Sequence, residues 1–278
     1  MHADDFQTLS SLLKKRSGLS LTEDKSYLLE SRLMPLVRRR RYSGLPELVQ
    51  AIRIKPDDSL LTEVTEVMTT NESFFFRDTR PFDQFRDVVL PQLKQSRASK
   101  KRIRIWSAAC SSGQEPYSLA IVIKEMGAEF AGWNIEIVGT DISEAILEKA
   151  REGIYSQFEV QRGLPIQLLM KYFTQVDTGW ELDESIRSMV QYRYFNLLDS
   201  MSALGTFDVV YCRNVLIYFD QPTKSDVLSR IRRQMSDDAV LYLGGAETVL
   251  GICEEFKPVT GQRGMYCIVN ESAERLVG

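Results

Sequence analysis

The chain has 278 residues, of which 44% are hydrophobic and 26% are charged, and its formal net charge is −3. These values are typical of a soluble globular protein with one large or two smaller domains, and no apolar run approaches the roughly 18 residues of a membrane span. The only histidine is His2, which removes Ser-His-Asp, Cys-His and histidine–metal chemistry from consideration. The N-terminus has no basic and then apolar signal pattern, so we expect a cytoplasmic protein.

The first 70 or so residues are expected to form a small helical bundle. Apolar residues recur at helical spacing in four segments, and Gly18 should end the first of them. Thr22 can cap a second helix that runs toward Tyr42, with a kink or break at Pro35. That helix should bury Leu28, Leu33, Leu36 and Val37.

Positive charge is concentrated in this first segment. Residues 1–60 contain 11 Lys and Arg against 8 Asp and Glu and so carry +3, which leaves −6 for the remainder. The densest run is Arg38–Arg41, with Arg32 and Arg53 near it. Two interpretations stay open: a docking surface for an acidic partner, or a solvated helix end whose cations complement the helix dipole.

The segment Thr69–Arg77 contains three consecutive aromatic residues next to Asn71, Ser73 and Arg77. This composition does not fit a simple amphipathic helix, so the segment is either a functional loop or aromatic packing between domains. Helical spacing resumes at Phe82, and residues 94–102 are polar and basic, as in a linker.

Residues 103–141 predict one βαβ unit. A short apolar strand turns through small residues up to Gly113, a helix begins near Pro116, and a second strand ends on Asp141. The turn has neither G-x-G-x-x-G nor a phosphate-binding lysine motif, and Glu115 at the helix start repels phosphate and favours a cation. S-adenosylmethionine fits this pattern because it is a cationic nucleoside without phosphate, and Asp141 suits its ribose. An ordinary turn with a solvent-facing Glu115 is the alternative.

The rest of the chain alternates between strands and helices. Ser143 can cap a helix, residues 163–173 are helical, and residues 180–194 alternate loosely, as in an antiparallel hairpin or three-stranded insert. A buried strand, 207–212, leads into Arg213, and further strands follow at 239–243 and 264–269. The four cysteines form no C-x-x-C pair, and we expect them to be small buried thiols rather than ligands or disulfides.

Three separated motifs carry a resemblance to a known family. Residues 70–77, 106–118 and 212–220 resemble the bacterial chemotaxis receptor methyltransferases of the CheR family, and residues 140–143 and 196–198 fall in the expected order between them. The resemblance implies an α/β protein: a class I S-adenosylmethionine-dependent methyltransferase with a Rossmann-like doubly wound sheet, an all-helical N-terminal domain and a small antiparallel β insert. The expected boundaries are 1–75 for the helical domain, 76–102 for a connecting helix and linker, and 103–278 for the catalytic domain, with the insert at about 174–195.

The resemblance also implies a reaction and its site. It implies methyl transfer from S-adenosylmethionine to glutamate side chains on the cytoplasmic helical region of membrane chemoreceptors, with S-adenosylhomocysteine as product. Arg77 and Tyr218 match the candidate catalytic positions. The positions that match cofactor contacts are Asn71, Ser73, Arg77, Ala108, Glu115, Asp141, Ile142, Asn196, Leu197, Asn214 and Val215. The candidate receptor-docking residues are Arg32, Arg38, Arg39, Arg40 and Arg41, and no metal is expected.

Two other functions remain as alternatives. A nucleic-acid methyltransferase should have an Asn/Asp-Pro-Pro-aromatic strand end, whereas Arg213 is followed here by Asn-Val-Leu, and the sequence pI is about 5.5. A catalytically inactive cofactor sensor is the other. We expect a monomer that is recruited to chemoreceptor arrays. The resemblance also implies that members whose insert binds a tethering receptor peptide are glycine-richer in its turn. The predicted turn here contains only Gly179, so we expect an enzyme that does not use such a tether.

Overall fold

The computed structural model describes residues 2–269, which form two compact units. The first comprises residues 2–70 together with Tyr218–Thr223, and the second comprises residues 71–217 and 224–269. Each unit has a hydrophobic core of its own.

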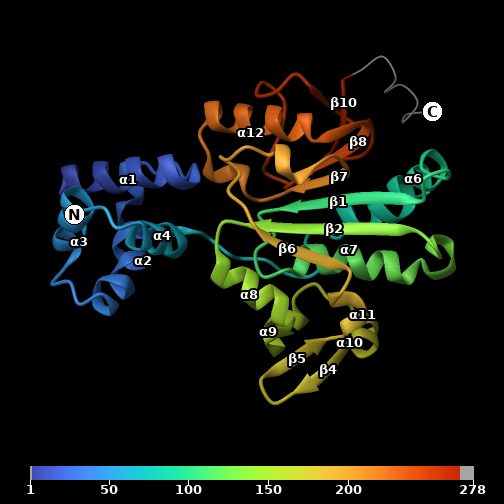
Figure 1. The fold of residues 1–278 in the computed structure, drawn as a ribbon, viewed down its shortest axis with the longest axis horizontal. Coiled ribbons are helices and arrows are strands. Elements are labelled where there is room, and N and C mark those ends of the chain that lie inside the picture. Colours follow the sequence, from blue (N-terminus) through green and yellow to red (C-terminus); the bar gives the residue numbers. More distant parts are fainter. Residues whose placement is uncertain (1, 270–278) are drawn as a thin grey trace. The chain divides into compact units, whose positions relative to one another are not determined.

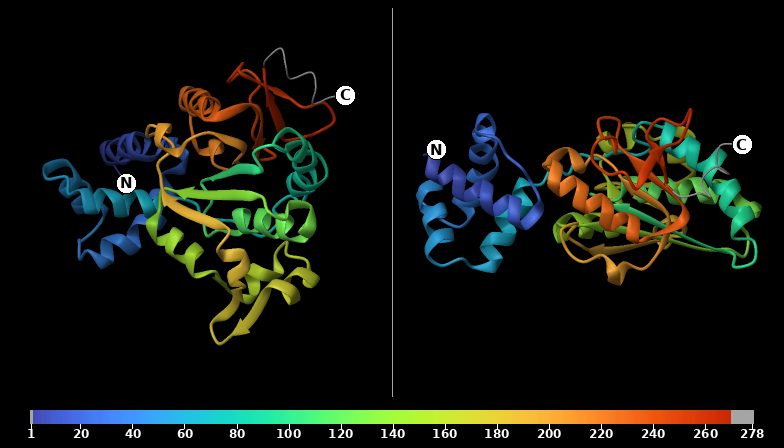
Figure 2. Two further views of the ribbon diagram at one scale, coloured as in Figure 1. Left: turned by 45° about the vertical axis from the view of Figure 1, so that its right-hand side comes forward. Right: turned by 90° about the horizontal axis from the view of Figure 1, so that it is seen from above.

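The first unit is a helical bundle, drawn in blue in Figures 1 and 2. Its helices are α1 (Ala3–Ser17), α2 (Ser26–Arg39), α3 (Leu45–Ile54) and α4 (Asp58–Met68), with a short 3-10 turn at Glu23–Lys25. Leu9, Leu13, Leu33, Leu48 and Val64 are fully buried in the core. The left-handed Gly18, with φ of 76°, ends α1 as predicted.

The second helix differs from its prediction in its first residue and in one of its buried residues, and the break that was one alternative at Pro35 is absent. It begins at Ser26, after the 3-10 turn, and the Thr22 side chain makes no capping bond. It is not broken at Pro35, which lies on an exposed face where water can satisfy the carbonyl group that loses its N–H partner. It buries Leu29, whereas Leu28 is half-buried, because Leu29 lies four residues before Leu33 and so shares its face of the helix.

The second unit is built on a seven-stranded sheet of order β6-β2-β1-β7-β8-β10-β9 (Figure 1). The strands are β1 (Arg102–Ala108), β2 (Asn134–Asp141), β6 (Val190–Tyr194), β7 (Phe207–Cys212), β8 (Met235–Leu243), β9 (Phe256–Pro258) and β10 (Met265–Ile268). The first five in this order are parallel, and β10 is antiparallel to its neighbours. The strand order reverses between β1 and β7, so a ligand site is expected at the carboxyl ends of these strands.

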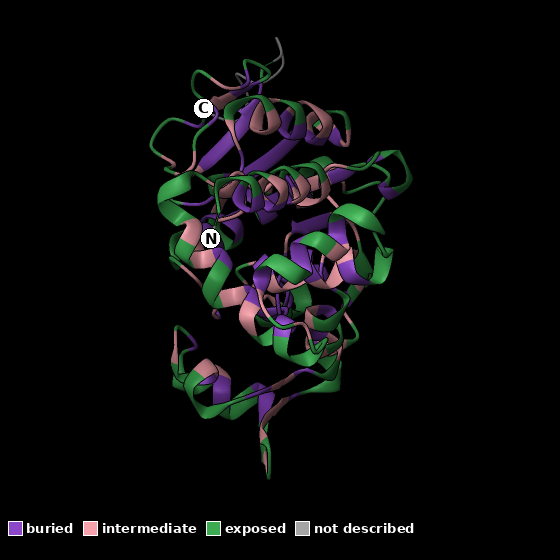
Figure 3. Ribbon diagram, turned by 90° about the vertical axis from the view of Figure 1, so that its left-hand side faces the viewer, coloured by how far each residue is buried: buried purple, intermediate pink, exposed green. Residues whose placement is uncertain are grey.

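Helices cover the parallel sheet and bury its strands. They include α5 (Arg80–Gln84), a π-helical segment (Phe85–Val89), α6 (Leu90–Ser96), α7 (Gln114–Glu125), α8 (Glu144–Glu152) and α12 (Gln221–Arg233), with 3-10 turns at Gly127–Phe130, Ser202–Leu204 and Leu216–Tyr218. Figure 3 shows the strands buried and most helices only partly buried, and α7 is the helix that is buried nearly all round. This near-continuous burial is usual for a parallel sheet that has helices on its faces.

A second, smaller sheet is inserted between α8 and β6. Its strands are β3 (Ile154–Tyr155), β4 (Phe173–Val176) and β5 (Gly179–Leu182), which pair antiparallel in the order β3-β5-β4. The helices of this region are α9 (Gln157–Gln161), α10 (Ile166–Tyr172) and α11 (Glu184–Arg187). The three-stranded insert was predicted, but residues 190–194 were wrongly placed in it. They form β6, which is parallel to β2. Because β6 is a mostly exposed strand at the edge of the sheet, its polar and apolar residues alternate as they do in a hairpin.

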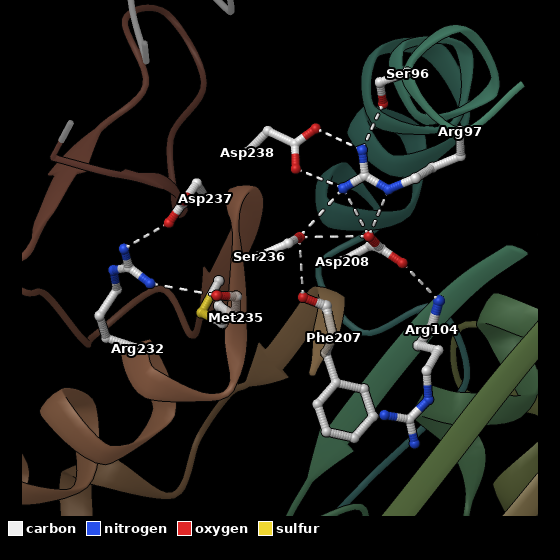
Figure 4. Close-up of polar contacts among 10 residues, drawn as sticks. All are labelled: Ser96, Arg97, Arg104, Phe207, Asp208, Arg232, Met235, Ser236, Asp237 and Asp238. Carbon is white, nitrogen blue, oxygen red and sulfur yellow. Dashed lines mark hydrogen bonds and ion pairs between the residues drawn. The ribbon is translucent and has the colours of Figure 1, made fainter. Parts of the chain in front are cut away.

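An ion-pair network joins the amino ends of three strands (Figure 4). The Arg97 guanidinium makes two bonds to the Asp238 carboxylate, of 2.8 and 2.5 Å, and its Nε donates to Asp208 Oδ1 at 2.9 Å. The other oxygen of Asp208 accepts the Arg104 N–H at 2.8 Å. Arg97, in the stretch that was predicted to be a linker, therefore fixes the end of α6 to β7 and β8.

Candidate active site

The turn after β1 is built for close packing. Ala109 and Ser111 have φ of 54° and 52°, and Gly113 has φ of 89°. A Cβ atom on Gly113 would lie 2.4 Å from the Tyr192 hydroxyl oxygen, so no larger residue fits there. Gly113, the last of the small residues in this run, is therefore required by the backbone path of the turn.

Asp141 ties this turn to the next one. Its Oδ2 accepts the Ser111 N–H at 2.9 Å, and its Oδ1 accepts the Ser143 N–H at 3.1 Å. The residue is buried, at the end of β2. A carboxylate has about four acceptor positions, so its chemistry suits the hydroxyl groups of a ribose.

Glu115 lies in the first turn of α7 and is held from both sides. Its Oε1 accepts the Ser107 hydroxyl at 2.8 Å, and its Oε2 pairs with the Arg213 guanidinium at 2.9 Å. Its side chain is only 12% exposed, so the alternative of a solvent-facing Glu115 is wrong. A carboxylate at this helix end opposes phosphate binding, which helix N-termini otherwise favour.

The aromatic loop, residues 71–77, is fastened to the β1 turn and to α7. Ser111 Oγ donates to the Asn71 carbonyl oxygen at 2.8 Å, and the Phe76 N–H donates to Ser118 Oγ at 3.0 Å. Phe75 is fully buried, with its ring in edge contact with Tyr155 at 4.9 Å and with Phe173 at 5.5 Å. The aromatic run therefore joins the loop to the insert, because Tyr155 belongs to β3 and Phe173 to β4.

The side chain of Arg77 folds back onto the aromatic loop. Its Nη1 donates to the Glu72 carbonyl oxygen at 3.0 Å, and its guanidinium carbon lies 5.4 Å from the centre of the Phe74 ring. Arg162 lies 4.3 Å from the same ring and pairs with the Glu72 carboxylate at 2.7 Å. Ser73 is half-buried between Glu72 and Phe74.

The remaining cofactor candidates follow the ends of β1, β2 and β6. Ala108 is the buried last residue of β1, and Ile142 follows Asp141. Asn196 Oδ1 accepts the Leu198 N–H at 3.0 Å, and Leu197 is buried. The Phe195 N–H donates to the Asp141 carbonyl oxygen at 2.9 Å, which brings this segment to the end of β2.

The segment after β7 is shaped by Glu247. Asn214 has φ of 61°, and its N–H donates to Glu247 Oε2 at 2.7 Å, as does the Gly244 N–H. The Ile217 N–H donates to Oε1 of the same carboxylate at 3.3 Å. A Cβ atom on Gly244 would lie 2.7 Å from Asn214 Nδ2 and 2.7 Å from Glu247 Oε2, so a larger residue would displace these two side chains.

Two predicted residues of this segment have different surroundings. Val215 directly follows Asn214 and is half-buried. Tyr218 comes three residues later and belongs to the first unit, where its carbonyl oxygen accepts the Ser20 N–H at 2.9 Å.

The candidate docking arginines differ in whether their guanidinium groups are already bonded within the helical unit. Arg32 donates to the carbonyl oxygens of Met68 and Thr69 at 2.7 and 3.2 Å, so it caps the end of α4. Arg39 and Arg40 both pair with Glu63. Arg38 and Arg41 are exposed, and neither guanidinium pairs with an acid within residues 2–269.

The sequence reading missed four side chains that hold these segments. They are Tyr155, Arg162, Arg213 and Glu247. Only Arg213 could have been found, because it lies inside a motif that carried the resemblance. The cysteines agree with their prediction: all four are buried and free, and burial raises the pKa of the Cys110 and Cys212 thiols well above its ordinary value.

Comparison with known proteins identifies the family. Residues 71–265 match the CheR methyltransferase SAM binding domain, and residues 4–69 match the CheR methyltransferase all-alpha domain. The chain belongs to the CheR methyltransferase family. The predicted family and fold class are therefore confirmed, and S-adenosylmethionine is the cofactor of this CheR protein. The donor set fits that cofactor, with Asp141 suited to a ribose and Glu115 to a cation.

Individual relatives match over nearly the whole chain. Chemotaxis protein methyltransferase Cher2 of Pseudomonas putida is 40% identical over 265 residues, which cover 94% of this chain and 96% of the relative. Chemotaxis protein methyltransferase 1 of Pseudomonas aeruginosa is 41% identical over 267 residues, with the same coverage. The chemotaxis protein methyltransferase of Vibrio parahaemolyticus is 36% identical over 264 residues, which cover 94% and 95%. Within residues 2–269, no helix is both long and apolar enough to span a bilayer.

Proposed function

We propose that this CheR protein transfers methyl groups to glutamate side chains of chemoreceptors and so forms glutamate methyl esters. The observation that supports this acceptor is the lack of a histidine base: the chain has one histidine, and it lies at position 2. A glutamate side chain has an ordinary pKa near 4.3 and is already ionised at neutral pH. It can therefore attack without giving up a proton to the enzyme.

The enzyme acts in this proposal by positioning and by excluding water. S-adenosylmethionine, when bound, supplies an electrophilic methyl group on a sulfonium. Asp141 accepts hydrogen bonds from the hydroxyl groups of the ribose, and Glu115 provides negative charge near the cationic part of the cofactor. Asn71, Ser73, Asn196 and Asn214 supply polar contacts, while Ala108, Ile142, Leu197 and Val215 supply apolar ones. Alignment of two reactants can contribute roughly 7–11 kcal/mol to a lower barrier.

Arg77 and Tyr218 are proposed to orient the acceptor carboxylate. Arg77 is half-buried and, within residues 2–269, pairs with no acid, so its guanidinium can offer charge-assisted hydrogen bonds to a carboxylate. Tyr218 carries a phenol that can donate a second bond. Neither residue needs to change its protonation state during the transfer.

The helical unit is proposed to dock the receptor. Its exposed arginines, Arg38 and Arg41, can attract a glutamate-rich helical region over a Debye length of about 8–10 Å. Arg39 and Arg40 contribute less in this scheme, because Glu63 already neutralises part of their charge. The protein would act as a cytoplasmic monomer recruited to receptor arrays, without nucleic-acid binding.

The proposed reaction is tested with purified protein, radiolabelled S-adenosylmethionine and cytoplasmic receptor fragments. Label should enter the fragments and be released by mild alkali, because carboxyl methyl esters hydrolyse there. Fragments with the acceptor glutamates replaced by glutamine are the control. Alkali-stable label, or label in added nucleic acid instead, would contradict the proposal.

The insert is proposed to act without a receptor tether. Gly179, which the sequence placed in the turn of the insert, is the first residue of β5. It has φ of 148°, and a Cβ atom there would lie 2.3 Å from the Tyr155 carbonyl oxygen, so the start of β5 is packed against β3. A pull-down with receptor C-terminal peptides should retain no peptide, and specific retention would overturn this part of the proposal.

A further inference from the structure

The backbone that follows the aromatic loop is strained. Phe76, Asp78 and Thr79 have φ of 52°, 69° and 48°, and none of them is glycine. Side chains make this region of backbone space unfavourable, and such residues persist only where surrounding contacts hold them. The strained stretch flanks Arg77 on both sides.

Arg213 supplies contacts that hold this stretch. Its Nη2 donates to the Arg77 carbonyl oxygen at 3.0 Å and pairs with the Asp78 carboxylate at 2.6 Å. Its Nη1 pairs with Glu115 at 2.9 Å. The Arg213 side chain is only 1% exposed and Glu115 is 12% exposed, so water screens their ion pair little, whereas the pair with the 53% exposed Asp78 is partly screened.

One guanidinium thus joins three segments that carry proposed site residues. These are the Arg77 loop, the first turn of α7 with Glu115, and the end of β7, where Asn214 follows. A guanidinium presents its donors in a fixed planar fork that reaches all three acceptors, whereas a lysine carries its three donors on one nitrogen at the end of a flexible stem. The arrangement also leaves a net charge of −1 on Asp78, Arg213 and Glu115, which suits a cationic cofactor.

We propose that Arg213 and Asp78 are positioning residues for methyl transfer: together they hold the strained loop and thereby set the place of Arg77. This inference rests on the proposed role of Arg77 in orienting the acceptor. The two residues touch neither cofactor nor acceptor in this scheme and act only through the loop.

Asp78→Asn tests the proposal, because the Asp78 side chain is 53% exposed and its replacement leaves the core unchanged. The matched control is Asp87→Asn, which also removes an exposed partner of an arginine: Asp87 pairs with Arg86 at 2.7 Å and is 57% exposed. The full chain is assayed for turnover number, the Michaelis constant for receptor fragments, melting temperature and amide hydrogen exchange of residues 76–79.

In the Asp78→Asn variant, the amide hydrogens of residues 76–79 should exchange faster and the turnover number should fall about tenfold. The Michaelis constant and the melting temperature should be unchanged. Asp78→Glu should restore most of the turnover, since its carboxylate can still pair with Arg213. Asp87→Asn should match the wild type throughout.

Two outcomes would overturn the proposal. If the amide hydrogens of residues 76–79 exchange at the same rate in Asp78→Asn as in Asp87→Asn, then Arg213 does not hold the loop through Asp78. If exchange accelerates but turnover stays at the wild-type value, the loop does not set the position of Arg77. A wild-type protein that methylates no receptor fragment would refute the proposed function instead, and the exchange comparison would still decide whether the loop is held.

Discussion

The hydroxyl group of Tyr155 donates a 2.8 Å hydrogen bond to the carbonyl oxygen of Ser112. Tyr155 lies in the first strand of the insert, and Ser112 lies in the turn after β1. Burial raises the pKa of Tyr155 well above its ordinary value, so the phenol stays a donor at any physiological pH. The insert is thereby bonded directly to the turn that is proposed to receive the cofactor.

Tyr155→Phe should loosen that turn. The change leaves the Ser112 carbonyl without this partner, which should cost about 1–3 kcal/mol of unfolding free energy and should weaken S-adenosylhomocysteine affinity. Tyr117→Phe is the control, because it removes a buried bond of 2.7 Å whose acceptor is the Ala150 carbonyl oxygen of α8 and not a carbonyl group of the turn. Denaturant titration and calorimetry measure the two effects. Equal cofactor affinity in both variants would show that the Tyr155 bond serves stability alone.

Asp141→Asn should lower S-adenosylhomocysteine affinity at least tenfold, because hydrogen bonds to a charged group contribute about 1.5–3 kcal/mol each. An amide keeps one acceptor oxygen, so part of the backbone bonding to Ser111 and Ser143 survives. Ser143→Ala is the matched control: it removes the cap of α8 at Ile146 but keeps the carboxylate. Unchanged affinity by calorimetry in Asp141→Asn would remove this residue from the proposed site.

Tyr218→Phe should lower the turnover number more than it lowers cofactor affinity, if the hydroxyl group acts mainly in the transition state. Steady-state kinetics with receptor fragments and calorimetry with S-adenosylhomocysteine separate the two quantities. Weak cofactor binding with normal turnover would make Tyr218 a cofactor residue and leave Arg77 alone to orient the acceptor.

Reversal of Arg38 and Arg41 to Glu should raise the Michaelis constant for receptor fragments and flatten its dependence on salt. The structure favours this pair over Arg39, whose replacement would also break the ion pair with Glu63. Cofactor affinity should not move. The control is a double reversal to Glu of Lys100 and Arg233, which are both exposed, because it changes the net charge by the same amount as the reversal of Arg38 and Arg41. Identical kinetics and salt slopes in the two double variants would reject the docking surface, and the solvated helix end would remain.

The Arg97 network should make stability depend on acid pH. The hydrogen bond from Arg97 lowers the pKa of the Asp238 carboxyl group. The ion pair therefore stabilises the folded state fully above the unfolded pKa of about 3.9, and this stabilisation is lost as the pH falls through the lowered pKa of the folded state. Asp238→Asn should therefore cost about 1 kcal/mol near pH 7, a partly screened value for a two-bond pair, and almost nothing near pH 2. Urea titrations at both pH values test this. Asp237→Asn, on a carboxylate that is 83% exposed, is the control, and an equal, pH-independent loss in both variants would contradict the assignment.

Local patterns predicted the elements that depend on neighbouring residues. The helical bundle, the strand–turn–helix–strand unit ending on Asp141 and the buried thiols are all read from spacing, small residues and burial. Of the kink or break predicted at Pro35, the break is absent, because α2 is continuous through this residue. Residues 190–194 were misread because the edge strand of a large sheet alternates like a hairpin.

Long-range polar partners could not be predicted in the same way. Glu247 lies 33 residues from Asn214 in the chain and meets it only because β7 and β8 are adjacent. Arg162 reaches Phe74 and Glu72 from the insert. Each contact depends on the folded path of the chain, which a single sequence does not display.

The packing of Phe75 between Tyr155 and Phe173 has a consequence for protein engineering. A Cβ atom on Gly163 would lie 2.1 Å from the Phe75 carbonyl oxygen, so loop and insert fit each other closely. The three-stranded sheet therefore cannot be exchanged on its own. A chimera that takes this sheet from another CheR protein must also take residues 72–76 from it, because a mismatched aromatic loop would leave gaps in the core beside the turn that follows β1.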